Sequence, residues 1–153
     1  MLKELEKLSA AEIEVMMKAP LLVCILIAGA DNEIDGKEIK GAIELARKGK
    51  TKASISDFYQ MASEDFEDKL KIILQGLPIE SMQRNPLIFE ELTQLNVILP
   101  KVNKVFAADF YKSLTYIAKK IAESSGGLLG MKTVGDEEIR LINLFMIKDP
   151  SLS

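Results

Sequence analysis

The sequence predicts an all-α protein, a compact multi-helix bundle formed by a single domain over residues 1–153. Apolar residues recur at helical spacing in six segments. No segment shows the alternation of apolar and polar residues, bounded by turn residues, that indicates a β-hairpin. With 48% hydrophobic and 28% charged residues, the chain has the composition of a globular protein. At this length it can bury a core without disulfides or metals.

The first predicted helix begins with a capping box, because Ser9 and Glu12 stand three residues apart before an apolar stretch. It extends towards Ala30. Pro20 predicts a kink or a restart, since proline has no N–H to donate to the helical ladder. The apolar run over 20–30 covers 11 residues, whereas a membrane span needs about 20. The run therefore predicts a buried central helix and no membrane insertion.

The second and third helices are predicted from their caps and apolar stripes. Asp35 and Glu38 repeat the capping-box spacing, and Gly49 ends the second helix. Its buried stripe is predicted to be Ile39, Ala42, Ile43 and Ala46. Ser63 is predicted to cap the third helix. The buried face of that helix is predicted to be Phe66, Leu70, Ile73 and Leu77.

Three more helices complete the predicted bundle. Asn85-Pro86 starts the first of them and Pro100 ends it, with a buried face of Ile88, Leu92, Leu95 and Leu99. The longest helix follows Val102, with the stripe Phe106, Phe110, Leu114, Ile117 and Ile121. The last helix begins near Asp136 and carries Ile139, Ile142, Leu144, Phe145 and Ile147.

The C-terminal part of the chain leaves two questions open. Residues 128–134 are assigned to no element. The last helix has apolar residues on more than one face, which is more than one core contact needs. It therefore predicts either a central position in the bundle or contact with another chain, as in a homo-oligomer or a complex with a protein partner.

The residue inventory excludes several classes of function. The chain has no histidine, which rules out histidine general bases, histidine-dependent serine or cysteine catalysis, and histidine-containing zinc or haem sites. Cys24 is the single cysteine and stands in an apolar segment, so it predicts an inert packing residue. The net charge of −3 argues against nucleic-acid binding. The first residues mix lysines with glutamates, unlike a signal peptide, and we expect a cytoplasmic protein.

The clearest local feature is an acidic turn between the first two predicted helices, with four carboxylates in eight residues. They are Asp31, Glu33, Asp35 and Glu38. Clustered oxygens on a bendable loop suit hard cations, so Ca²⁺ or Mg²⁺ is the expected ligand. An EF-hand is excluded, because the twelfth position counted from Asp31 is Ala42 instead of glutamate. The alternative, which stays open, is that these acids only cap a helix and interact with its positive end.

A second acidic helix start lies near the C-terminus. Residues 34–39 and 134–139 match at an offset of 100 residues, and the weaker second copy contains Asp136 and Glu138. The match indicates either an internal helix-turn-helix duplication or the general preference of helix starts for acidic residues.

The segment around the acidic turn resembles the signature of the tellurite-resistance protein TerB-like family. It reads Ile27-Ala-Gly-Ala-Asp31-Asn-Glu-Ile-Asp35-Gly-Lys-Glu38-Ile39. In that signature an apolar helix ends in Ala-Asp-Gly, and Glu-Ile-Asp and a further Glu precede the next helix. Here Asn32 replaces the usual glycine, and Gly135 stands in the second copy where the first has Asp35. The resemblance implies a compact helical fold, a role related to tellurite resistance or stress, and an acidic patch for metal ions at Asp31, Asp35 and Glu38.

These observations lead to the expectation of a non-enzymatic helical module whose acidic turn binds a divalent cation or a basic partner surface. The alternative is a structural or oligomerisation domain whose acidic turn only caps helices. A carboxylate-dependent hydrolase would need acids that converge from several helices, and Asp136 and Glu138 are the only distant candidates. No catalytic residue is assigned.

Overall fold

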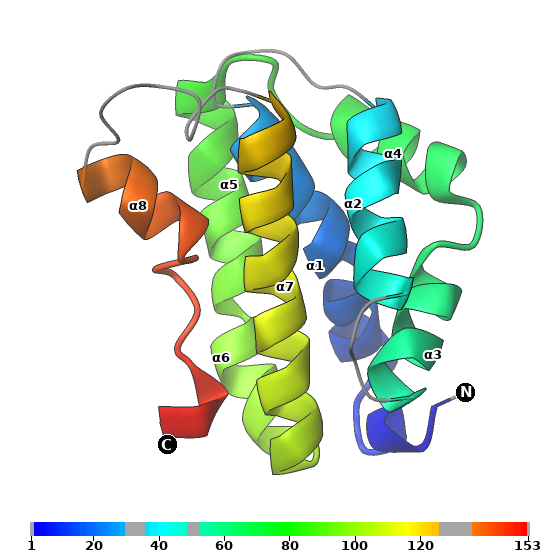
Figure 1. Ribbon diagram of the computed structural model, residues 1–153. Helices are drawn as coiled ribbons and strands as arrows, with labels where there is room; N and C mark the ends of the chain where they lie inside the picture. The colour runs from blue at the N-terminus through cyan, green and yellow to red at the C-terminus, as the bar shows by residue number, and fades with distance from the viewer. Residues whose placement is uncertain (1, 30–35, 49–52, 126–135, 153) are drawn as a thin grey trace.

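The computed structural model describes residues 2–29, 36–48, 53–125 and 136–152, and within these ranges every regular element is a helix (Figure 1). The predicted all-α fold is confirmed. In chain order the elements are η1 (Lys3–Leu5), α1 (Ala10–Ala28), α2 (Gly36–Lys48), α3 (Ala53–Ala62), α4 (Phe66–Gln75), α5 (Ser81–Thr93), α6 (Leu95–Ile98), η3 (Leu99–Lys101), α7 (Lys104–Ser125), α8 (Asp136–Ile142) and η4 (Pro150–Leu152).

The centre of the bundle is formed by α1 and α7, which pack against each other. In Figure 1, α7 runs through the middle of the view with α2 on one side and α5 on the other. The predicted stripe of α7 is buried at every position: Phe106, Phe110, Leu114, Ile117 and Ile121. At 22 residues α7 is also the longest helix of the described chain, as the sequence predicts.

Of the kink or restart predicted at Pro20, the structure excludes the restart. A single helix runs from Ala10 to Ala28 without a restart. An internal proline costs a helix about 3 kcal/mol. Here the residues after it, 21–28, are all buried, so packing of a helix that is apolar on every side outweighs the lost hydrogen bond. The prediction of a central buried helix is confirmed.

The capping box at the start of α1 is present as predicted. The backbone N–H of Glu12 donates to Ser9 Oγ at 3.1 Å, and the backbone N–H of Ser9 donates to Glu12 Oε1 at 2.9 Å. The other carboxylate oxygen of Glu12 accepts a hydrogen bond from Lys101 Nζ at 2.6 Å. The Lys101 ammonium and the Ser9 amide together lower the pKa of Glu12.

Replacing Glu12 with glutamine is expected to make the protein less stable at neutral pH but not in acid. A carboxyl whose folded-state pKa is lowered stabilises the fold above its unfolded pKa of about 4.3 and loses this contribution as the pH falls through the folded value. Melting temperatures of the wild type and Glu12→Gln should therefore differ at pH 7 and converge towards pH 3. Glu67→Gln, which removes an exposed carboxylate from α4, is the matched control. A gap that stays constant with pH would contradict this account.

The buried residues of α2 are those predicted from the sequence. The helix that follows it, α3, was not predicted. The buried residues of α2 are Ile39, Ala42, Ile43 and Ala46. The predicted end at Gly49 lies outside the described residues, and α2 is described to Lys48. The additional helix α3 buries Ile55, Phe58, Tyr59 and Ala62 against the core. Their spacing of three, one and three residues is a helical stripe, so the signal was present in the sequence.

Ser63 does not cap the third predicted helix. It follows the end of α3, and its hydroxyl donates back to the carbonyl oxygen of Gln60 at 3.1 Å. The residue that precedes α4 is Asp65, whose φ of 52° lies in the left-handed region. The two helices α3 and α4 are close in sequence, so this serine serves the end of one helix instead of the start of the next. Phe66 and Leu70 are buried in α4 as predicted.

The helix predicted to start at Asn85-Pro86 begins earlier, at Ser81. Pro86 is therefore the sixth residue of α5 instead of its first. The first turn is held by a tertiary contact of Arg84, described below, which the local pattern does not reveal. The predicted apolar face is confirmed, although the chain divides there into α5, α6 and η3: Ile88, Leu92, Leu95 and Leu99 are all buried.

The last helix is shorter than predicted, because α8 ends at Ile142. Leu144 has a φ of 53°, which no α-helix accommodates. The side chain of Asn96 holds the following segment in a non-helical form: its Nδ2 donates to the carbonyl oxygen of Met146 at 3.0 Å, and its Oδ1 accepts from the N–H of Lys148 at 2.8 Å. Ile142, Leu144 and Ile147 are buried, whereas Ile139 and Phe145 are nearly half exposed.

Two sequence-based predictions are only partly covered by the described residues. Residues 128–134 lie outside them, as do the first two residues of each of the two matching segments, 34–35 and 134–135. No helix in the described ranges combines the length and the apolar character needed to cross a membrane.

Candidate functional site

The carboxyl end of α1, where the acidic turn begins, contacts a buried arginine from α5. Arg84 Nη2 donates to the carbonyl oxygen of Gly29 at 2.9 Å, and its Nη1 donates to the carbonyl oxygen of Ile79 at 3.1 Å. The residue is only 3% exposed, and this burial lowers the pKa of its guanidinium. The cation lies where the last carbonyl groups of α1 carry partial negative charge, which is the favourable end of a helix for it.

Gly29 provides the space that the guanidinium occupies. A Cβ atom at this position would lie 2.1 Å from Arg84 Nη2, far inside van der Waals contact. The φ of Gly29 is −78°, which any residue adopts, so glycine is needed for space and not for its conformation. The hydrogen bond between Arg84 and Gly29 connects α5 to the end of α1, and the two residues are 55 positions apart in sequence.

The charge of Arg84 is incompletely compensated by the described residues. Its Nε is buried and has no hydrogen-bond partner in the part of the chain that the structure describes. Among the carboxylates whose side chains the structure describes, none forms an ion pair with it. Buried charges are normally paired, whereas the described residues give this guanidinium only the carbonyl oxygens of Gly29 and Ile79. No local pattern in the sequence distinguishes Arg84 from an exposed arginine, which explains why sequence reasoning missed it.

The structure places only part of the predicted acidic site. Asp31, Glu33 and Asp35 lie outside the described residues. Glu38 is in the first turn of α2 and is half-buried. In the second copy, Asp136 is the first residue of α8 and Glu138 the third, while their side chains lie outside the described part of the chain.

A metal centre made wholly of described residues is not found. Within the described ranges, no group of three or more acidic or cysteine side chains is close enough to hold a metal ion. The predicted metal site depends on Asp31, Glu33 and Asp35 and stays a prediction.

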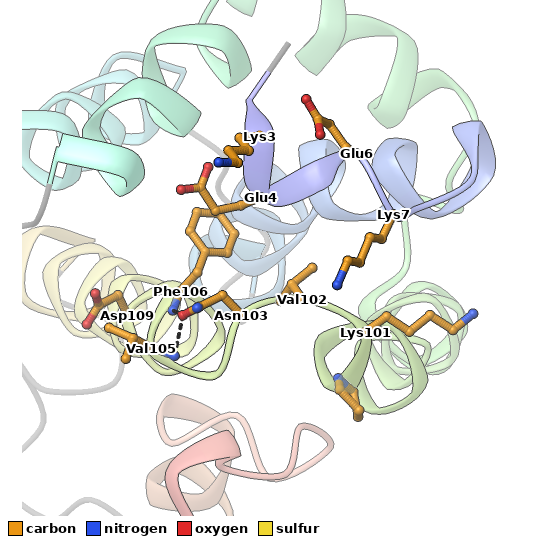
Figure 2. Close-up of a pocket in the computed structure, with 11 residues that line it drawn as sticks. Lys3, Glu4, Glu6, Lys7, Lys101, Val102, Asn103, Val105, Phe106 and Asp109 are labelled. Carbon is orange, nitrogen blue, oxygen red and sulfur yellow. Dashed lines mark hydrogen bonds between the residues drawn. The ribbon is translucent and has the colours of Figure 1, made fainter.

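A separate hollow of about 580 Å³ lies between η1, η3 and the start of α7 (Figure 2). Lys7 points its ammonium group towards this hollow, whereas Lys101 points away from it (Figure 2), towards its partner Glu12. Asn103 Oδ1 already accepts from the N–H of Val105 at 2.9 Å and from the next N–H at 3.2 Å, so it caps α7. Charges of both signs line the hollow, and they indicate no particular class of ligand.

Tyr59, Ser113 and Cys24 are buried in the core. Tyr59 and Ser113 are hydrogen-bonded to each other, and Cys24 is a free, buried thiol. Ser113 Oγ donates to the carbonyl oxygen of Phe110 at 2.6 Å, so the hydroxyl of Tyr59 is the donor in its 2.7 Å bond to Ser113. Burial raises the pKa of the Tyr59 phenol and of the Cys24 thiol well above their ordinary values. The predicted packing role of Cys24 is confirmed by its complete burial.

A groove with a basic rim lies between α2 and α4. It has a volume of about 740 Å³, and its apolar wall includes Phe66 and Leu70. The described charged residues around it are Lys37, Lys40, Lys71 and Glu67. Positive side chains therefore predominate on this surface.

The described fold places the chain in the class of all-helical bundle domains. The sequence matches no family model, no curated protein and no solved structure. The resemblance to the TerB-like family therefore depends on residues 27–39, on the second acidic helix start near the C-terminus and on the all-helical fold.

Proposed function

We propose that this chain is a non-enzymatic, TerB-like helical module whose acidic turn between α1 and α2 binds a divalent cation, Ca²⁺ or Mg²⁺, or a basic partner surface. The observation that carries the proposal is the position of the turn. It joins the end of α1, which Arg84 holds, to α2, whose apolar stripe is buried in the bundle. The sequence between these two packed helices contains Asp31, Glu33 and Asp35, and Glu38 follows in the first turn of α2.

The chemistry of the turn supports a cation as its first ligand. Hard divalent cations prefer several carboxylate and carbonyl oxygens on a flexible loop. Glu38 adds a half-buried carboxylate in the first turn of α2, on the helix that follows Asp35. By the resemblance to TerB-like proteins, Asp31, Asp35 and Glu38 are the metal-binding positions.

The residues available argue for binding rather than catalysis. The chain has no histidine, and Cys24 and Tyr59 are both fully buried with raised pKa values. A metal-dependent hydrolase would need Asp136 or Glu138 to meet the acidic turn, and nothing described brings them together.

A second candidate, in which the acidic turn is structural, is favoured by Arg84. The buried guanidinium has an Nε without a partner and no ion pair with any described carboxylate. The acids that follow Gly29 would then balance the charge of Arg84, and Asp35 would cap α2. Such a module would need no cation.

Adding millimolar Ca²⁺ or Mg²⁺ is expected to raise the melting temperature relative to a sample with chelator. A ligand that binds only the folded state at 100 times its Kd adds about 2.7 kcal/mol of stability. Asp31→Ala and Asp35→Ala should both abolish the gain, while Glu67→Ala, an acid on α4 outside the turn, should keep it.

The structural candidate gives a different pattern in the same measurement. The wild type would show no cation-dependent shift, and Asp35→Ala would cost about 1 kcal/mol through the lost cap. That result would leave the helix caps, or a basic protein surface, as the explanation of the acidic turn.

A further inference from the structure

We propose that the groove between α1, α4 and α5 binds an amphipathic helix of a partner protein that carries basic residues beside its apolar face. This surface, named here the α4/α5 groove, is formed by Leu22, Ile72, Ile73, Leu77, Leu87 and Ile88. None of these residues belongs to the acidic turn, so the inference is independent of the proposed cation site.

The α4/α5 groove is an apolar surface with a volume of about 480 Å³. Leu22 of α1 and Ile88 of α5 are buried and form its base, while Ile73 is half-buried. On its two sides Ile72 is 66% exposed and Leu87 is 46% exposed. Volumes of this size are typical of sites that receive apolar groups.

Exposed apolar residues are concentrated in this part of the chain. Four of the eleven large apolar side chains that are exposed in the described residues lie between positions 72 and 87. Besides Ile72 and Leu87, they are Ile79 and Met82, which are 88% and 89% exposed in the connection from α4 to α5 and the first turn of α5. Of these four, Ile72 and Leu87 line the α4/α5 groove, and exposed apolar side chains that share one groove mark a binding surface more often than scattered single residues do.

The charges around the α4/α5 groove select a basic partner. The described charged residues that line it are Glu14, Glu90, Glu91 and Lys18. Lys18 already pairs with Glu14 at 3.4 Å, so Glu90 and Glu91 give the groove a negative edge. The groove on the other side of α4 has a predominance of lysines. A basic helix is therefore attracted to the α4/α5 groove and repelled from the neighbouring one.

An amphipathic helix fits a groove of this form because its apolar residues recur on one face. Side chains at positions i, i+3, i+4 and i+7 enter an apolar groove, and the flanking residues meet its polar edges. Lysine or arginine at those flanks would lie beside Glu90 and Glu91. The apolar contacts provide affinity, and the charges provide orientation and speed of association.

The probe is a fluorescently labelled peptide of about 18 residues, roughly five helical turns, with leucines at helical spacing and lysines at the other positions. A second peptide has glutamate in place of every lysine. Fluorescence anisotropy at low salt is expected to show binding of the basic peptide alone. Ile72→Ser and Leu87→Ser should each weaken it about tenfold or more, since anchors of an interface carry most of its affinity.

Matched variants distinguish binding of the basic peptide in the groove from its nonspecific electrostatic attraction to an acidic protein. Val97 of α6 is 65% exposed, close to the value for Ile72, but it lies outside the groove, so Val97→Ser should leave the affinity unchanged. The double change Glu90→Lys and Glu91→Lys should weaken binding and reduce its salt dependence, whereas Glu67→Lys should not. Circular dichroism melts confirm that each variant is folded. Asp31→Ala with Asp35→Ala should leave peptide binding intact, which separates this inference from the cation site.

Three outcomes would overturn the proposal. The first is no binding of the basic peptide, or equal binding of the acidic one. The second is an equal loss of affinity in Val97→Ser and Ile72→Ser. The third is self-association of the wild type in light scattering that Ile72→Ser abolishes, because the occupant would then be a second copy of this chain.

Discussion

Replacing Phe110 with alanine is expected to lower the free energy of unfolding by about 3–5 kcal/mol. Phe110 is the seventh of the 22 residues of α7 and is fully buried. Its ring makes an edge contact with Phe58 of α3 at a centroid distance of 5.1 Å and stacks near Phe106 at 6.5 Å. The variant loses the burial of the ring and leaves a cavity between α7 and α3. Domains of this size have a total stability of about 5–15 kcal/mol, so the loss is a large fraction of it.

Urea denaturation measures this change, with Tyr116→Ala as the matched control. Tyr116 is an aromatic residue of the same helix, but its side chain is exposed. Its removal should change the stability by no more than about 0.5 kcal/mol. Similar losses in both variants would show that the burial of the Phe110 ring does not account for the loss of stability.

The second large effect is expected at the end of α1. Gly29→Ala should cost about 1.5–3 kcal/mol, because the new Cβ displaces the Arg84 guanidinium and breaks a buried hydrogen bond from a charged donor. The clash is specific, since the 2.1 Å approach is to Arg84 Nη2. Arg84→Met removes the guanidinium and leaves space for the methyl group.

A double-mutant cycle tests this pair. In the Arg84→Met background, Gly29→Ala should lose most of its cost, which gives a coupling energy of about 1.5–3 kcal/mol between the two sites. Gly41→Ala is the control, because no atom lies within 4 Å of its added Cβ and it stands inside α2. There alanine should stabilise the protein by about 0.5–1 kcal/mol. An equal cost of Gly29→Ala in both backgrounds would contradict the role assigned to Arg84.

The helices themselves were largely predictable because their signals are local. The Ser9 capping box and the buried stripe of α7 follow from residues three and four positions apart, which the helix brings onto one face. The buried stripe of α3 has the same helical spacing, although no helix was predicted at this position. The candidate acidic turn was likewise visible as a run of carboxylates in the sequence.

Helix ends were predicted less well, because tertiary contacts decide them. The local residues Asn85-Pro86 indicate a start, yet Arg84 anchors an earlier turn of α5 to the carbonyl of Gly29. The bonds from Asn96 to the backbone of residues 146 and 148 hold the segment after α8 in a non-helical form. These contacts join residues that are 55, 50 and 52 positions apart in sequence, so no local window contains the information.

The sequence by itself thus determined the all-α class, the buried face of most helices and the acidic character of the turn between α1 and α2. Only the tertiary structure decided that a buried arginine meets the end of α1, and that Ile72 and Leu87 stay exposed around one groove. The physical reason is that periodicity shows that a helix has an apolar face but not which neighbours cover it. The exposure of a side chain depends on how α1, α4 and α5 pack together, and this is a property of the assembled bundle.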